Sequence, residues 1–395
     1  MEPTNTFLKR AEEMAEELVA MRRHFHENPE LGMGTTNTAA FVVSKLKEMG
    51  YEPQTVAETG VTATVGKAGG KVLLLRADMD ALPMQEESGL EFASKVPGAA
   101  HCCGHDLHTA MLLGAAKLLK EQEESLEGMI KLLFQPAEEN MQGARAMIEA
   151  GVMENPHVDA AFAIHVNSIA KSGRLLVFGG PTCASSDLFT IRIKGHGGHG
   201  SRPDETVDPL NVASHIHIAL QALQARELRA GETGVLTVGC IKGGTTFNVI
   251  PDEAVMLGTV RTYNKEVREM LLKRMKDIAA DIAHAFRAEA TVELSDNYTI
   301  PLVSDKDMAA FAVNSFREML PQEQVVSMQK SFPGSEDFAF IADKVPTLFV
   351  VLGATVQMGT EFGQHHPKVK FNEACLPIGA AAYAQMACEW LKKNK

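Results

Sequence analysis

The chain has 395 residues, a net charge of −12 at pH 7, 45% hydrophobic residues and 22% charged residues. This length exceeds what one hydrophobic core ordinarily holds, so we expect a globular protein of two domains. The negative charge argues against nucleic acid or an anionic membrane as a partner, and no apolar run approaches the roughly 18 residues of a membrane span. A charged, amphipathic start and six scattered cysteines predict a cytoplasmic protein without a disulfide framework.

Helices and strands alternate in the first part of the chain. Apolar residues at helical spacing predict the helices, and short, almost continuously apolar runs predict the strands. This alternation indicates an α/β layer with a largely parallel sheet flanked by helices. In chain order the predicted elements are helices over 7–25 and 36–49, strands over 61–65 and 72–75, a helix over 108–121, a strand over 129–134, a further helix, and a strand over 160–164.

The middle of the chain has a different order of elements. Strands and helices follow one another as β-α-β-β-α-β, the ferredoxin-like order, which forms a compact α+β unit. The chain then returns to α/β material and ends with a helix over 374–393. We therefore predict a metal-binding domain over 1–184 and 298–395, into which a smaller domain over 185–297 is inserted. The strands of the insert are expected over 188–194, 235–241, 247–260 and 290–295, and its helices over 209–226 and 265–287.

Chemically active side chains follow several of the predicted strands. Asp78, the pair Glu138 and Glu139, and His165 each come shortly after a strand. In parallel sheets, ligands bind beyond the carboxyl ends of the strands, so these groups are expected to meet at one edge. Two neighbouring glutamates also allow one carboxylate to bind a metal while the other carries a proton.

Further metal-binding side chains lie in loops. Cys103 and His105 come just before a predicted helix, and His365 precedes His366 and Pro367. Each feature is weak alone, because a Cys-x-His triplet is more often incidental, paired glutamates usually mark a solvated surface, and a strand histidine is more often a core residue. Together they offer thiolate, imidazole and carboxylate, a set that suits borderline metals such as zinc.

The number of these donors fits a two-metal site. If one residue bridges, five residues would give each of two ions three protein ligands and a shared water, the open arrangement of a catalytic site. This pattern predicts a metal-dependent hydrolase. The five residues are Cys103, His105, Glu139, His165 and His365.

The loop from Gly195 to Gly200 matches the dinucleotide-binding pattern G-x-G-x-x-G and follows a predicted strand. The segment Ser201-Arg202-Pro203-Asp204 intervenes before the next helix, and no second strand with a terminal acid follows at the right distance, so the confirming context is missing. We therefore do not favour a dinucleotide site. His199 in this glycine-rich loop instead suggests a mobile imidazole that reaches a polar group elsewhere.

The motifs taken together resemble those of the aminoacylase-type N-acyl-amino-acid amidohydrolases, within the two-metal carboxypeptidases and deacylases. Relatives in that group include hippurate hydrolases, N-acetyl-diaminopimelate deacetylases and plant auxin-conjugate hydrolases. The resemblance spans nearly the whole chain. The motifs that carry it are Arg76-Ala77-Asp78-Met79-Asp80-Ala81-Leu82-Pro83, Cys103-Gly104-His105-Asp106, Gln135-Pro136-Ala137-Glu138-Glu139, Gly197-Gly198-His199, Ser335-Glu336-Asp337-Phe338 and His365-His366-Pro367.

The resemblance implies roles for individual residues. The five donors named above would bind two divalent ions, which could be zinc, manganese, cobalt or nickel, and Glu138 would be the general base. The inserted domain would be a lid and dimerisation domain, whose His199 enters the partner's site in dimeric relatives. Asn248 and Arg261 would hold the substrate's carboxylate. Asp78 stands where the broader two-metal peptidases place a histidine ligand.

The function implied is hydrolysis of the amide bond of N-acyl-L-amino acids by a homodimer or higher homo-oligomer. The products would be a carboxylic acid and a free amino acid. A dipeptidase or carboxypeptidase that uses the same site is the alternative among enzymes. A catalytically silent metal-binding scaffold is the alternative from another class, and the presence of both Glu138 and His199 speaks against it.

Overall fold

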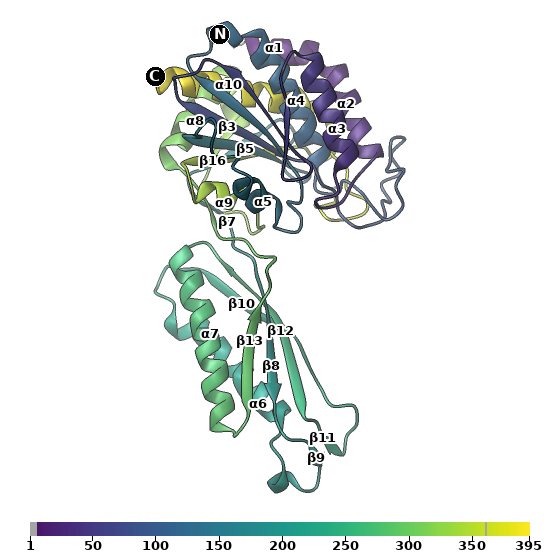
Figure 1. Ribbon diagram of the computed structural model, residues 1–395, viewed down its shortest axis with the longest axis vertical. Coiled ribbons are helices and arrows are strands. Elements are labelled where there is room, and N and C mark those ends of the chain that lie inside the picture. The colour runs from purple at the N-terminus through teal and green to yellow at the C-terminus, as the bar shows by residue number, and fades with distance from the viewer. Residues whose placement is uncertain (1–5, 360–361) are drawn as a thin grey trace. The chain divides into compact units, whose positions relative to one another are not determined.

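The computed structural model describes residues 6–359 and 362–395 (Figure 1). These residues form two compact units. Unit 1 comprises the described residues within Met1–Thr182, Val303–Ser331 and Asp337–Lys395, and unit 2 comprises Cys183–Leu302 and Phe332–Glu336.

Unit 1 is built on an eight-stranded sheet. Its strands are β1 (Gln54–Val56), β2 (Gly60–Gly66), β3 (Val72–Asp78), β4 (Met129–Gln135), β5 (Ala160–Asn167), β6 (Leu175–Phe178), β15 (Val325–Met328) and β16 (Thr347–Gly353). They lie in the order β1-β2-β4-β3-β5-β16-β6-β15. The centre is parallel, because β3 pairs in parallel with β4 and β5, and β5 with β16, whereas β2 and β6 run antiparallel to β4 and β16. The mixed, largely parallel sheet confirms the predicted fold class.

Helices cover this sheet (Figure 1). Packing contacts place α3, α4, α10 and α8 side by side across the strands, with α1 and α2 against α4 and α10. The single helix predicted over 7–25 is wrong in one respect, because the segment forms two helices that are separated at Met14. There the Met14 N–H donates to Ala11 O, which makes a tighter turn than that of an α-helix. The helices of unit 1 are α1 (Thr6–Glu13), α2 (Ala15–Glu27), α3 (Thr36–Glu48), α4 (His105–Glu121), α5 (Gly143–Glu149), α8 (Lys306–Met319), α9 (Ala339–Ala342) and α10 (Leu376–Lys393).

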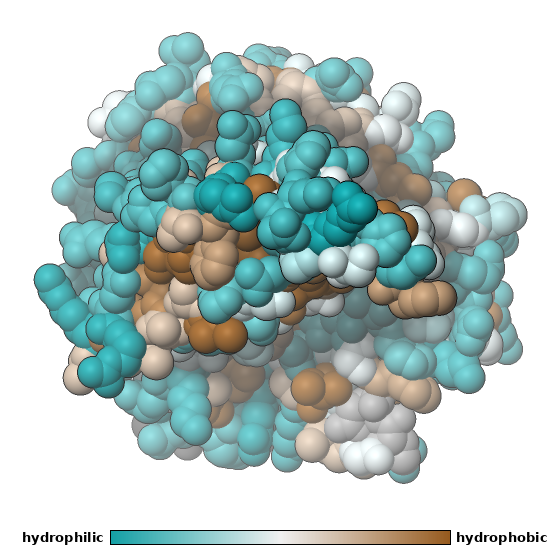
Figure 2. Space-filling model, turned by 90° about the horizontal axis from the view of Figure 1, so that it is seen from below, coloured by the Kyte–Doolittle hydropathy of each residue, from teal (hydrophilic) through white to brown (hydrophobic). Residues whose placement is uncertain are grey.

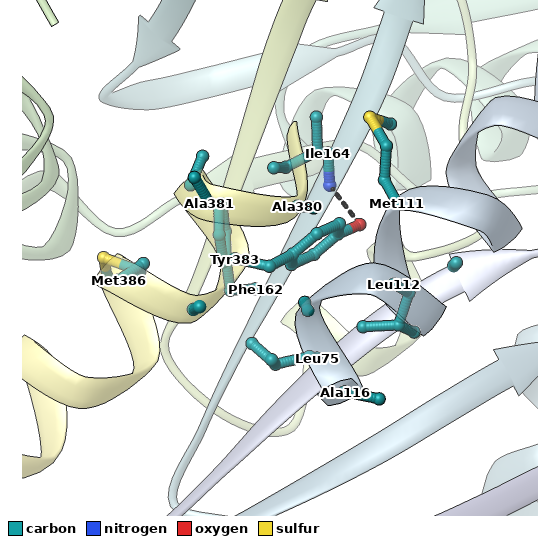
Figure 3. Close-up of a cluster of buried hydrophobic side chains, with 14 of the residues drawn as sticks. Leu75, Met111, Leu112, Ala116, Phe162, Ile164, Ala380, Ala381, Tyr383 and Met386 are labelled. Atoms are coloured by element: carbon teal, nitrogen blue, oxygen red, sulfur yellow. Dashed lines mark hydrogen bonds between the residues drawn. The ribbon is translucent and has the colours of Figure 1, made fainter. Parts of the chain in front are cut away.

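One hydroxyl ties the C-terminal helix to the two central strands. Tyr383 of α10 donates to Arg76 O in β3 at 2.7 Å and accepts from Ile164 N in β5 at 2.9 Å. Figure 3 shows this side chain among buried neighbours that include Phe162 and Met111. The contact fixes β3 and β5 to each other close to their carboxyl ends.

Unit 2 has the ferredoxin-like order of elements. They are β8 (Asp187–Lys194), α6 (Pro209–Glu227), β10 (Gly234–Gly243), β12 (Glu253–Thr262), α7 (Lys265–Ala285) and β13 (Glu289–Leu294). The four strands form an antiparallel sheet in the order β10-β12-β8-β13. Side chains of β8 alternate between buried and exposed, and its buried members Phe189, Ile191 and Ile193 join a core with the two helices.

The strand predicted over 247–260 is wrong in extent. It is divided into β11 (Val249–Ile250) and β12, with Pro251 between them. Proline has no N–H to donate to a ladder, so the pairing stops there. The short β11 pairs instead with β9 (Gly198–His199) in a separate ribbon. Two further short strands, β7 (Gly180–Cys183) and β14 (Leu302–Ser304), pair with each other.

The surface is mostly polar on the face that Figure 2 displays, where hydrophilic side chains surround smaller hydrophobic areas. Exposed apolar side chains on the strands of unit 2 include Leu188, Val235 and Leu257. None of the helices in the described part of the chain has the length and apolar character needed to cross a membrane.

Candidate metal centre

The carboxyl ends of β3, β4 and β5 lie at one edge of the sheet because these strands are parallel. Asp78 ends β3 opposite Gln135, which ends β4. His165 lies near the end of β5, and the turn after β4 carries Glu138 and Glu139. The structure therefore brings together the groups that the sequence places at strand ends.

The first cluster of donor atoms joins β5, the start of α4 and the turn after β4. The Cys103 sulfur lies 3.5 Å from His165 Nε2. His105 Nε2 lies 3.8 Å from Glu139 Oε1 and 3.9 Å from Glu138 Oε2. Sets of three donors, such as Cys103, His105 and His165, lie close enough together to hold one ion.

The loop after β16 adds a further donor. His365 Nε2 lies 3.5 Å from Glu139 Oε2, and Cys103, Glu139 and His365 form a second possible set around one ion. The His365 N–H donates to Cys102 O at 3.0 Å, which anchors the loop to the Cys103 segment. All five predicted donors are thus close together, and Cys103, His105 and Glu139 each belong to more than one set.

Unusual backbone conformations surround these side chains. Gly104 has φ of 101°, and a Cβ there would lie 2.3 Å from Val166 Cγ2, so only glycine allows α4 to begin against β5. Ala137 and His365 have φ of 58° and 64°, which L side chains rarely adopt. Residues held in such conformations cluster at functional sites.

Asp80 orients three of the site residues. Its carboxylate accepts hydrogen bonds from the backbone N–H groups of Glu138 at 3.0 Å and Glu139 at 3.1 Å. Its carbonyl oxygen lies 2.8 Å from His105 Nδ1. A carbonyl only accepts, so Nδ1 carries the proton and Nε2 is the nitrogen left to bind an ion. Sequence reasoning assigned no role to Asp80, although the residue lies within one of the motifs.

Burial and neighbouring carboxylates shift the pKa values of the donors. Burial and the Glu139, Glu138 and Asp78 carboxylates raise the pKa of the Cys103 thiol well above its usual range. Burial raises the pKa of Glu139 to about 7, although His105 opposes the shift. His105 Nε2 and Glu139 Oε1 are buried and have no hydrogen-bond partner. A divalent cation fits this set, because it would neutralise the carboxylates, stabilise a thiolate and coordinate both atoms.

A buried network lies behind the donors. Arg76 donates to Asp78 Oδ2 at 2.5 Å and to Asp337 Oδ1 at 2.9 Å. Gln135 Nε2 donates to both oxygens of Asp337, and the Asp337 N–H lies 3.4 Å from Glu138 Oε1. The network holds the ends of β3 and β4 and the Glu138 side chain in place. In the sequence, Arg76, Gln135 and Asp337 each lie within one of the motifs. Nothing in those motifs predicts that the three side chains bond to one another.

The predicted site residues of unit 2 lie at two different places in that unit. His199 is exposed on β9, its Nδ1 accepts from Ser201 N, and the neighbouring Gly200 N–H donates to Asn248 O. Arg261 is near the other end of β12, where it donates to Ser335 Oγ. From Glu253 to Arg261 a strand rises by about 26 Å. His199 and Asn248 are therefore together, whereas Arg261 is far from both within unit 2.

The fold and the donor set define a metal-dependent hydrolase. The model of the peptidase family M20/M25/M40 matches residues 74–389, and the chain belongs to this family. It is 41% identical to the IAA-amino acid hydrolase ILR1-like 4 of Arabidopsis thaliana, over 96% of this chain and 86% of the relative. It is 38% identical to an N-acetylcysteine deacetylase of Bacillus subtilis, over 94% and 96% of the two chains.

A solved structure adds to the comparison of folds. A Bacillus subtilis protein described as a dinuclear metal binding peptidase of the M20 family superposes with a TM-score of 0.83. The two chains are 36% identical, over 96% of this chain and 99% of that one. The protein is accordingly a metal-dependent amidohydrolase of the predicted group.

Proposed function

We propose that this protein hydrolyses the amide bond of N-acyl-L-amino acids and releases a carboxylic acid and a free amino acid. The observation that carries the proposal is the buried carboxylate of Glu138 beside five potential metal ligands. The names of the relatives support the substrate class, since an IAA-amino acid hydrolase and an N-acetylcysteine deacetylase both cleave amides of amino acids. The scattered free cysteines support a cytoplasmic location.

The metal centre proposed here holds two divalent ions, which are zinc, manganese, cobalt or nickel. Cys103, His105, Glu139, His165 and His365 would be the ligands, with one of them shared. The ions would supply Lewis acidity, which polarises the scissile carbonyl and lowers the pKa of an attacking water. Asp78 is not among the proposed ligands, and its two carboxylate oxygens accept hydrogen bonds from Arg76 and His108.

Glu138 is proposed as the general base. Its side chain is 4% exposed, and its Oε1 lies 3.4 Å from the Asp337 N–H. The Asp80 carboxylate holds the Glu138 N–H, so the side chain is oriented from two directions. In this position Glu138 would take a proton from the attacking water and deliver it to the leaving nitrogen.

His199, Asn248 and Arg261 are proposed to complete the site across a dimer. Arg261 and Asn248 would bind the substrate's carboxylate, and His199 would stabilise charge on the carbonyl oxygen. Because about 26 Å of strand separates Arg261 from the loop of Asn248, the two cannot hold one carboxylate within a single chain. We therefore propose that His199 and Asn248 act in the partner's site. Exposed Leu188, Val235 and Leu257 support a protein contact made by unit 2.

A substrate panel tests the proposed activity. The protein, loaded with zinc, manganese, cobalt or nickel, would be incubated with N-acetyl and N-benzoyl amino acids and with dipeptides, and free amino acid would be quantified. We expect faster release from the N-acyl amino acids. Faster cleavage of dipeptides would favour the dipeptidase or carboxypeptidase alternative. Ions bound without cleavage of any compound would favour the silent scaffold.

A further inference from the structure

His108 is a buried imidazole at the metal centre that the proposed ligand set does not use. It lies three residues after His105 on α4, and its side chain is 1% exposed. Residues three apart on a helix project from the same face. The His108 ring therefore lies next to the His105 ring, and the two ring centroids are 5.3 Å apart.

Both nitrogens of His108 are engaged, and the partners fix its protonation. The Val166 N–H donates to His108 Nε2 at 2.8 Å. A backbone amide can only donate, so Nε2 carries no proton. The proton of the neutral ring is then on Nδ1, which lies 2.5 Å from Asp78 Oδ1 and donates to it. The ring thus has one defined tautomer, with one donor and one acceptor in use.

These two hydrogen bonds link α4, which carries the proposed ligand His105, to β3 and to β5, which carries the proposed ligand His165. Asp78 ends β3, and Val166 follows His165 in β5. The His108 and His165 rings contact each other edge to face, with centroids 4.5 Å apart and an interplanar angle of 68°. His108 therefore touches the rings of His105 and His165 and links α4, β3 and β5 at one point.

We propose that His108 is a positioning residue, which fixes the separation and orientation of His105 and His165 and is not itself a metal ligand. Asp78, His105 and His108 do lie close enough to hold an ion as a set of three. To bind it, however, His108 would have to lose its hydrogen bond to either Val166 N or Asp78. The inference rests on the proposed metal centre, because it assigns His108 a role toward those ligands.

The test compares His108→Phe with a variant that loosens the same strands without touching the site. Phenylalanine keeps the ring but removes both hydrogen bonds. Tyr383→Phe is the matched control, because it removes the hydrogen bonds from one hydroxyl to Arg76 O in β3 and Ile164 N in β5. His108→Asn and His108→Gln each keep a polar side chain that can make one of the two bonds, and they carry the test if the Phe variant does not fold.

The readouts are the affinity for zinc by titration calorimetry, the number of ions per subunit, and the absorption spectrum of the cobalt-loaded protein. We expect His108→Phe to bind zinc about 10–100-fold more weakly, the usual effect of removing a group that orients metal ligands. Its cobalt spectrum should differ from that of the wild type, and the Asn and Gln variants should fall between the two. Tyr383→Phe should lower the unfolding temperature but keep wild-type affinity and spectrum.

Two results would overturn this role for His108. Wild-type zinc affinity and cobalt spectrum in His108→Phe would mean that His108 does not orient the ligands. Loss of one whole ion, with the other site unchanged, would make His108 a ligand rather than a positioning residue. Failure of the wild-type protein to bind two ions would instead contradict the proposed ligand set, so the two hypotheses can be told apart.

Discussion

Glu138 and Glu139 are neighbours in the chain and both carboxylates lie near His105 Nε2, but each also has a partner of its own. Glu139 lies between His105 and His365, whereas Glu138 Oε1 faces the Asp337 N–H. Ala137, immediately before them, has a left-handed backbone conformation. This division of roles leads to different expectations for two isosteric substitutions.

Glu138→Gln should retain both ions and lose about 10²–10⁴ in turnover, because an amide cannot accept the proton of the attacking water. Glu139→Gln should lose metal as well as activity, since the amide is a poor replacement for a ligating carboxylate. Metal content by mass spectrometry and kcat for an N-acyl amino acid measure the two effects. A Glu138→Gln enzyme with wild-type kcat would remove Glu138 from the mechanism.

The two adjacent cysteines provide a second comparison at the scale of residues. The Cys103 sulfur is 3.5 Å from His165 Nε2, whereas Cys102 contributes its backbone oxygen to hold His365. Cys103→Ala should lose metal and turnover, and Cys102→Ala should keep both. Bound metal should also protect the Cys103 thiolate from alkylation. Near-wild-type metal content and activity in both variants would exclude a thiolate ligand.

Between elements, α2 is fastened to α4 by a buried charged network. Arg22 Nε donates to Asp106 Oδ2 at 2.7 Å, and His26 joins Asp106 to Glu86 at 2.8 and 3.1 Å. Burial raises the pKa of Glu86, but hydrogen bonds from His26, Ser88 and Ser94 outweigh it, and the pKa lies at about 2. Burial lowers the pKa of His26, but Asp106 and Glu86 reverse the shift and raise it above the usual 6.5.

These shifts predict a dependence of stability on pH. The pKa of Glu86 is below its usual value of 4.5, so its stabilisation is present above pH 4.5 and is lost as the pH falls toward about 2. The pKa of His26 is raised, so its contribution is complete below pH 6.5 and declines as the pH rises through the folded-state pKa.

Denaturant unfolding of the wild type and of Glu86→Gln between pH 3 and 6 measures how much the Glu86 carboxylate contributes to the free energy of unfolding. The difference in unfolding free energy should shrink as the pH falls. A difference that stays constant across this range would contradict the pKa assigned to Glu86.

The elements also show what sequence patterns can and cannot predict. Continuous apolar runs predicted β3, β4 and β5 and, through them, the edge where the donors meet. The break at Met14 and the division at Pro251 were missed because hydrophobic spacing continues across both. The hydrogen bonds of Asp80, His108 and Asp337 were also missed, since they join residues from separate segments and only the fold brings them together.

At the scale of the whole molecule, the proposed dimer predicts that two inactive variants repair each other. A His199→Ala subunit keeps its metal centre, and a Glu138→Gln subunit keeps its lid. Each mixed dimer would then have one intact site, and random reassortment should restore roughly a quarter of wild-type activity. Differently tagged subunits would confirm the exchange. Proven mixed dimers without any recovered activity would mean that His199 does not act in the partner's site.

The measurement that tests the central claim most directly follows metal binding and amide hydrolysis in the same samples. Chelator-treated protein would receive zinc or manganese in steps, while bound ions per subunit and release of free amino acid from an N-acyl amino acid are recorded. We predict no release from the metal-free protein and full release when two ions are bound per subunit. Hydrolysis at the wild-type rate without metal, or no hydrolysis of any N-acyl amino acid by the fully loaded protein, would contradict the account.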